Sequence, residues 1–153
     1  MISLHLRKLL FTLTMATTAG LLTSCDLIPF SSGELSGTLQ SIPDSWTNKA
    51  TAKVIELETN PEDPYSVKLW IIGDNQKLYV HAGANRATWV EHLQQNAKAK
   101  VLIDNNLYEL VAQRVTKQAE FDQFSALYEV KYGRRPRNED VREAYLFSLT
   151  ARD

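Results

Sequence analysis

Two pairs of apolar runs, each joined by a short turn of aspartate, asparagine or glycine, most constrain the fold of this chain. They read SVKLWII-GDN-QKLYVHA at 66–82 and KAKVLI-DNN-LYELVAQRV at 98–115. Aspartate, asparagine and glycine accept the left-handed backbone that tight hairpin turns require. The sequence therefore predicts two antiparallel hairpins, with turns at 73–75 and 104–106.

Two further runs complete the set of predicted strands. The first is KATAKVIELE at 49–58, and the two prolines of TNPEDPY at 59–65 predict a turn after it. The last apolar run, EAYLFSLTAR at 143–152, fits a helix or a strand by its periodicity. Because five strands leave open edges, we expect 143–152 to be the sixth strand.

A short helix is predicted between the two hairpins. TWVE has the form of a capping box, in which Thr88 accepts from an amide one turn later and Glu91 reaches back. Trp89 and Leu93 then share one face, and Asn96 can end the helix.

A longer helix is predicted from Lys117 to Gly133, where the glycine ends it. Its aromatic residues recur at spacings of three and four, which places them on one face. Such a stripe is more typical of a helix docked on a barrel than of a cofactor wall. The aromatic residues are Phe121, Phe124, Tyr128 and Tyr132. The predicted fold class is α+β, mainly β, with six antiparallel strands and two helices.

The N-terminus has the layout of a secretory signal. His5, Arg7 and Lys8 precede an apolar run at 9–22, which is too short for the roughly 20 residues of a bilayer-spanning helix. Small residues then lead to the only cysteine of the chain, Cys25.

The sequence LTSC at 22–25 resembles the lipobox of bacterial lipoproteins. The resemblance implies that residues 1–24 are removed and that Cys25 carries fatty acyl chains such as palmitate, anchoring a periplasm-facing protein in the cell envelope. Asp26 resembles the signal for retention in the inner membrane. An ordinary signal peptide followed by an incidental cysteine is the alternative.

Composition separates a tether from a single domain. Residues 25–45 are rich in serine, proline and glycine, which is typical of a flexible tether. Residues 46–153 have the length of one domain. Removal of 1–24 leaves 129 residues with fifteen basic and eighteen acidic side chains, so we expect no nucleic-acid partner. A lipidated Cys25 leaves no free thiol.

The order of the predicted elements, and the stretch LYVHAGANRATWVEHLQQNAKAKVLIDNNLYELVAQRV at 78–115, resemble the split β-barrel of the flavin-binding pyridoxamine-phosphate-oxidase superfamily. Within this superfamily, the stretch at 78–115 resembles the deazaflavin-dependent nitroreductase branch. The resemblance covers about 50–152. It implies a six-stranded antiparallel split β-barrel, an FMN or deazaflavin cofactor, and either a homodimer or a monomer.

Four residues are carried over as the implied cofactor site: Lys68 on the second strand, and His81, Arg86 and Trp89 around the loop and helix start. Each also has a simpler interpretation, with Lys68 facing solvent from a strand and Trp89 buried in the core. The only other histidine of the domain, His92, lacks the neighbours of a metal site, so no metal is expected.

Two functions remain open from the sequence. The first is a membrane-anchored flavin or deazaflavin oxidoreductase. The second is a non-enzymatic envelope lipoprotein that uses the barrel as a binding or assembly module. It is favoured by Glu62 and Asp63 in the 59–65 turn, where the resembling family has a basic, glycine-rich phosphate loop. The arginines of GRRPR (133–137) form a basic patch that suits a solvated loop or an anionic partner.

Overall fold

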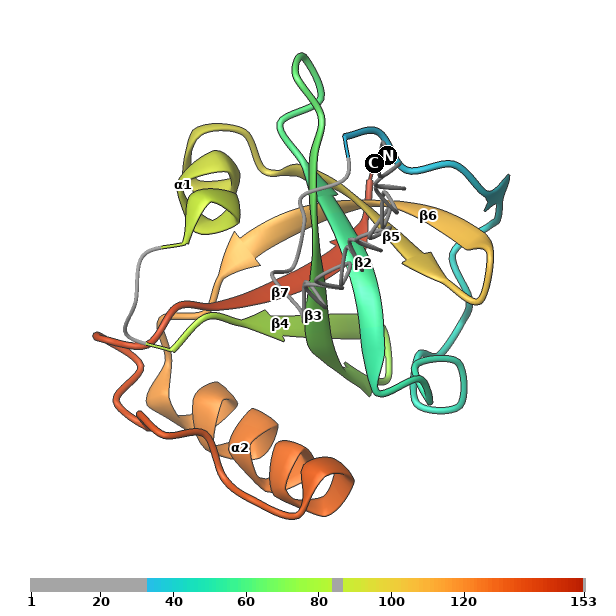
Figure 1. The fold of residues 1–153 in the computed structure, drawn as a ribbon. Coiled ribbons are helices and arrows are strands. Elements are labelled where there is room, and N and C mark those ends of the chain that lie inside the picture. The colour runs from blue at the N-terminus through green and yellow to red at the C-terminus, as the bar shows by residue number, and fades with distance from the viewer. Residues whose placement is uncertain (1–32, 84–86, 153) are drawn as a thin grey trace, which may run out of the picture.

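The computed structural model describes residues 33–83 and 87–152 (Figure 1). Cys25 and Arg86 lie outside these ranges. The described elements are β1 (Thr38–Leu39), β2 (Val54–Thr59), β3 (Tyr65–Asp74), β4 (Lys77–His81), α1 (Thr88–Gln95), β5 (Lys98–Ile103), β6 (Asn106–Arg114), α2 (Gln118–Tyr132) and β7 (Leu146–Ala151). No helix among them is long and apolar enough to cross a membrane.

Six antiparallel strands close into a barrel, which confirms the predicted fold class. The strands follow the order β6-β5-β2-β3-β4-β7, and β7 returns to pair with β6. The short strand β1 is an addition, because it pairs in parallel with the start of β6. The run at 143–152 thus forms the closing strand, and it removes the edges that five strands would expose.

Two apolar cores lie on the two faces of the sheet. One fills the barrel, and the other lies between the outside of the barrel and α2. Alternate residues of one strand serve both, since Leu146 packs under α2 while Phe147 points into the barrel. In Figure 1, α1 lies at the upper left of the barrel and α2 lies below it.

Both predicted hairpins form, although one turn is shifted. Asp104 and Asn105 make the β5–β6 turn with φ of 47° and 66°, as expected for a two-residue hairpin. In the β3–β4 hairpin the turn is residues 75 and 76, and Gly73 lies inside β3 opposite Leu78.

Gly73 lies inside a strand because the preceding segment crosses it closely. A Cβ at this position would lie 2.6 Å from both Ala50 Cβ and the carbonyl oxygen of Trp46. Trp46 itself is fully buried against the ring of Tyr108, with 4.9 Å between the ring centroids. The glycine therefore serves packing here rather than the turn.

The helix ends match the prediction except at the start of α1. Ala87 is the N-cap and no side chain caps the helix, so the expected capping box of Thr88 and Glu91 is wrong. α1 ends before Asn96 as predicted, and α2 ends at Gly133, whose φ of 72° is the left-handed conformation expected there.

The strand expected at 49–58 begins later, at Val54. The carbonyls of Ala50 and Ala52 do not join a sheet, because both accept hydrogen bonds from Lys131 Nζ on α2, at 2.6 and 2.8 Å. The same ammonium donates to the carbonyl of Ile71 at 2.9 Å. Next to it, the Tyr132 hydroxyl oxygen lies 2.8 Å from the carbonyl oxygen of Ile71 and 2.9 Å from that of Lys53, so its single proton is shared between these two acceptors. These contacts, the α2 clamp, fix the end of α2 to the barrel.

The described part of the segment expected as a tether contacts the barrel. The backbone N–H of Leu35 donates to the buried carboxylate of Glu58 at 2.6 Å, and Lys100 pairs with the same carboxylate at 3.0 Å. Ser66 Oγ donates to the carbonyl of Gly33 at 2.7 Å. A buried charge needs hydrogen-bonding partners, and Leu35 supplies one of them to Glu58.

We expect Gly73→Ala to lower the free energy of unfolding by about 1–3 kcal/mol, because the added methyl group overlaps backbone atoms of the crossing segment. Urea titration followed by tryptophan fluorescence measures the change. Gly33→Ala is the matched control, because its added Cβ would come no closer than 3.9 Å to another residue. Equal effects of the two substitutions would contradict the close crossing at Gly73.

Candidate functional site

His81 ends β4 and faces α2 rather than the barrel interior. Its ring lies near Phe121, Phe124 and Tyr128, with centroid distances of 6.0, 5.6 and 6.4 Å. The aromatic stripe predicted from the sequence therefore forms the wall behind this histidine.

The protonation state of His81 follows from its surroundings. The backbone N–H of Gly83 donates to His81 Nε2 at 3.2 Å, so Nε2 carries no proton and Nδ1 carries it in the neutral ring. Burial, assisted by the charge of Arg114, lowers the pKa of His81 to about 4. At neutral pH the ring is an uncharged hydrogen-bond donor.

A cavity of about 410 Å³, which we call the His81 cavity, opens beside this ring. It has the size of a small-molecule site, and among the described residues no carboxylate lines it. The end of β4 and the loop after α2 supply most of the lining. The lining residues are His81, Ala82, Gly83, Tyr128, Arg134, Arg135, Pro136, Arg137 and Asn138.

The three arginines of the His81 cavity differ in how far they are already engaged. Arg135 Nη2 pairs with Glu139 at 2.8 Å and is committed within the protein. Arg134 lies over the ring of Trp70, with Cζ 4.7 Å from the ring centroid. Arg137 is exposed and has no ion-pair partner among the described residues. Arg137 in particular keeps its donors for a ligand.

The loop that carries these arginines is held from beneath by α2. Gln118 donates to the carbonyl of Glu139 and accepts from the backbone N–H of Val141. The fully buried Ser125 donates to the Glu139 carboxylate at 3.1 Å. The arginine side chains thus project from a fixed backbone.

A fourth arginine lies behind the cavity. Arg114, at the end of β6, lies 4.6 Å over the ring of Tyr145 and donates to the carbonyl of Val141 at 3.1 Å. Its Nη1 is buried and has no hydrogen-bond partner in the described structure. Burial lowers the pKa of this guanidinium. The region around His81 is therefore positive and rich in hydrogen-bond donors.

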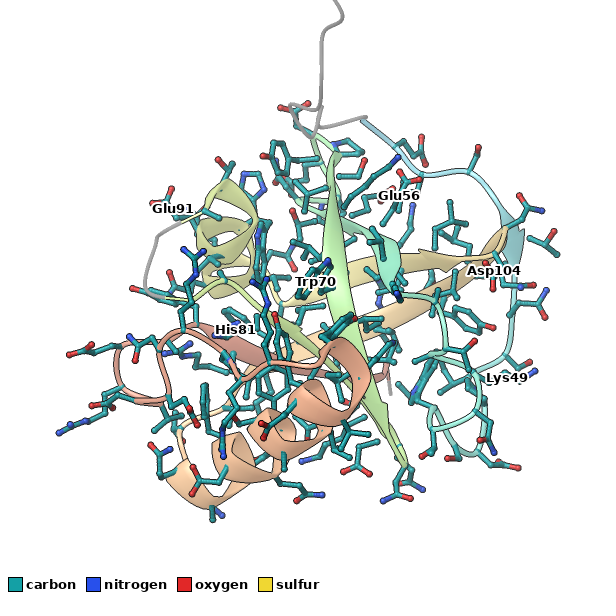
Figure 2. All side chains as sticks on the ribbon, turned by 60° about the horizontal axis from the view of Figure 1, so that its bottom comes forward. Lys49, Glu56, Trp70, His81, Glu91 and Asp104 are labelled. Carbon is teal, nitrogen blue, oxygen red and sulfur yellow. The ribbon has the colours of Figure 1, made fainter. Side chains whose placement is uncertain are left out.

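The three described residues of the predicted cofactor site do not converge. Lys68 is exposed on β3 opposite Glu56, and both line a separate cavity of about 310 Å³ with Asp104. In Figure 2, His81 lies beside α2, whereas Glu56 and Asp104 lie away from that helix.

Trp89 is likewise absent from the lining of the His81 cavity. Only 3% of its surface is exposed, and it packs edge-on against Phe147 in the barrel core. Of the three predicted residues that the structure describes, only His81 lines the cavity.

Some of the residues that line the cavity could be recognised in the sequence. The GRRPR motif marked Arg134, Arg135 and Arg137 as a basic patch, and Tyr128 belonged to the aromatic stripe. Residues 133–137 lie more than 50 positions after His81 in the sequence. Only the closure of the barrel brings them beside it, so their spacing could not predict this contact.

Another cavity, of about 520 Å³, lies between the β3–β4 hairpin and the start of α2. Two of its charged groups pair with each other, since Lys77 Nζ lies 2.7 Å from Glu120 Oε1, and the Tyr79 hydroxyl donates to the same oxygen at 3.0 Å. We interpret this cluster as structural. No group of histidine, cysteine or acidic residues suited to a metal ion occurs within 33–83 and 87–152.

No protein-family model matches the chain, and no curated protein matches its sequence. Solved structures do share its fold. A candidate pyridoxamine 5′-phosphate oxidase from Listeria innocua superposes with a TM-score of 0.55 at 13% identity, covering 69% of this chain and 90% of that chain. A candidate 5-nitroimidazole antibiotic resistance protein from Bacteroides thetaiotaomicron superposes with a TM-score of 0.55 at 14% sequence identity. The match covers 69% of this chain and 76% of that chain.

An FAD-binding protein from Mesorhizobium loti has a TM-score of 0.53 at 12% identity, covering 69% of this chain and 83% of that chain. These likenesses establish that the chain has the split β-barrel fold. Fold alone does not specify a function, which has to be argued from the residues of the site.

We expect the His81→Gln substitution to make the protein less sensitive to acid. Since the folded-state pKa of about 4 lies below the ordinary 6.5, the unfolded chain takes up a proton that folded His81 does not. The free energy of unfolding therefore falls as the pH is lowered from about 6.5 to 4, by at most about 3 kcal/mol from this group. Urea titrations across this range measure it, and parallel profiles for wild type and variant would contradict a buried neutral His81.

Proposed function

We propose that this chain is a lipid-anchored envelope protein whose split barrel binds a flavin-type cofactor, FMN or a deazaflavin. The observation that carries the proposal is the His81 cavity, which is donor-rich and whose described lining holds three arginines and no carboxylate. The same fold occurs in an FAD-binding protein, which supports the class of ligand.

The lining of the His81 cavity fits an anionic cofactor that carries a ring system. Arg134 and Arg137 offer positive charge, and His81 offers a neutral N–H donor. Tyr128 and the phenylalanines behind His81 form an aromatic wall. A flavin bound there would supply hydride transfer, while the residues of this chain bind and orient it.

The proposal places the cofactor away from Lys68 and Trp89. Glu56 and Asp104 beside Lys68 would repel a phosphate, and Trp89 is buried among core residues. His81 is thus the predicted residue that the proposed site retains.

Anchoring is the second part of the proposal, and it rests on the lipobox-like LTSC at 22–25. Residues 1–24 are the signal that is removed, Cys25 carries the lipid, and the barrel within 46–153 faces the periplasm. Several acyl chains on one cysteine hold a protein stably in a bilayer. Asp26 favours the inner membrane.

A non-enzymatic binding or assembly module remains the second candidate function. It is favoured by the exposed Glu62 and Asp63, which stand where the resembling family has a basic phosphate loop. Bound flavin without turnover of a reduced nicotinamide would support this candidate, and turnover would support an oxidoreductase.

We expect the full chain, extracted from bacterial membranes in mild detergent, to bind FMN or a deazaflavin saturably and to retain it through gel filtration. Lys68→Met is the matched control and should bind as the wild type does, because Lys68 lines a different cavity. A colourless protein that binds neither FMN, FAD nor a deazaflavin would refute the proposal. Loss of binding in Lys68→Met alone would move the site to the Lys68 cavity.

We expect Cys25→Ser to move the protein from the membrane fraction to the soluble fraction, since serine cannot form the thioether to lipid. Ser24→Ala is the control, because a small residue is kept before the cysteine and anchoring should persist. Mass spectrometry of the N-terminal peptide checks the acyl chains. Membrane retention of Cys25→Ser after carbonate washing would contradict the lipid anchor.

A further inference from the structure

We infer that the loop segment 134–138 is a phosphate-binding element, in which Arg134 and Arg137 hold the phosphate monoester of a soluble ligand. This inference rests on the proposed function in that it places the charged end of the proposed cofactor. It also gives the loop after α2 the role of phosphate binding, which the acidic turn at 59–65 cannot fill because its carboxylates would repel a phosphate.

The donors available in the His81 cavity decide the charge of the ligand. Arg137 has no ion-pair partner among the described residues. Arg134 lies over the ring of Trp70 and hydrogen-bonds to the Tyr128 side chain, and neither contact neutralises its charge. Arg135, by contrast, is already neutralised by Glu139. Two guanidinium groups therefore remain with unmet charge, and a dianion matches them better than a single carboxylate does.

The electrostatic surroundings favour the same ligand. Arg114 adds positive charge behind His81, and it has no carboxylate partner among the described residues. His81 is neutral, so it can donate through Nδ1 without adding a charge. A phosphate monoester offers three acceptor oxygens and a charge of about −1.5 to −2 at neutral pH, as known for phosphorylated side chains.

The loop is fixed before any ligand arrives. Pro136 is buried between Arg135 and Arg137, so the backbone between the arginines is held both by its ring and by packing. Gln118 and Ser125 of α2 hold the following residues from below. An anion that binds here pays little for ordering the backbone, which favours recognition over a transient surface contact.

The volume of about 410 Å³ argues that the phosphate is one end of a larger molecule, because inorganic phosphate would fill only part of the cavity. Tyr128 and His81 line the remaining space on one side, and the buried Phe124 packs behind both rings. The shared chemistry is thus a phosphate group attached to a less polar body, which a soluble cofactor or a lipid headgroup can supply. We assign it to a soluble monoester.

The test compares FMN with riboflavin, which differ only in the phosphate, on the full chain in detergent. We expect wild-type protein to bind FMN at least about tenfold more tightly, corresponding to about 1.4 kcal/mol. We expect Arg137→Met and Arg134→Met to reduce this ratio toward one by weakening FMN binding more than riboflavin binding. Arg142→Met is the control, because Arg142 is exposed, pairs with Asp140 and does not line the cavity.

Two outcomes separate this inference from the proposed function. Equal binding of FMN and riboflavin by the wild type would overturn the phosphate element while flavin binding stands. If no flavin binds, inorganic phosphate decides: it should raise the melting temperature of the wild type and of Arg142→Met but not of the Arg134→Met/Arg137→Met double variant. A uniform response of all three proteins would overturn the inference.

A third arm distinguishes the source of the phosphate. Phosphatidylglycerol added to the micelles should not displace FMN from the wild type, because the cavity is assigned to a soluble monoester. If phosphatidylglycerol displaces FMN from the wild type but not from Arg137→Met, the cavity binds a lipid headgroup. That result would overturn the assignment to a soluble monoester.

Discussion

The α2 clamp is the interaction on which the rest of the structure depends. A single ammonium, Lys131 Nζ, lies within 2.9 Å of three backbone carbonyls, from Ala50, Ala52 and Ile71. Burial lowers the pKa of this lysine, yet the three carbonyls satisfy its three donors. Because the carbonyls come from the crossing segment and from β3, one side chain joins the N-terminal segment, the barrel wall and the last turn of α2.

The position of the candidate site follows from this clamp. Tyr132 follows Lys131, and its ring stacks on the ring of Trp70 with 4.4 Å between the centroids. Arg134 lies over the same indole ring. The loop of arginines therefore starts at a point that is fixed on β3. Its far end is fixed by Glu139, which pairs with Arg135 and accepts a hydrogen bond from Ser125. A barrel strand and a helix end together place positive charge beside His81, without any contribution from the acidic turn at 59–65.

Local chemistry explains why much of the fold could be predicted from the sequence. The Asp104–Asn105 turn, the aromatic stripe of α2 and Gly133 each act through neighbours within a few residues. The errors have long-range causes. Ala50 and Ala52 have strand-like sequence, but their carbonyls bind a lysine 80 residues away, and the arginines were visible as a basic patch whose partner, His81, only barrel closure brings near. Lys68 was chosen by resemblance, and its neighbours Glu56 and Asp104 come from other strands.

The measurement that tests the central claim most directly is a crystal structure of the protein grown with FMN. The account predicts the phosphate within hydrogen-bonding distance of Arg134 and Arg137, the ring system beside Tyr128 and His81, and the Lys131 contacts unchanged. Density for FMN beside Lys68, or a phosphate that faces solvent away from the arginines, would contradict it.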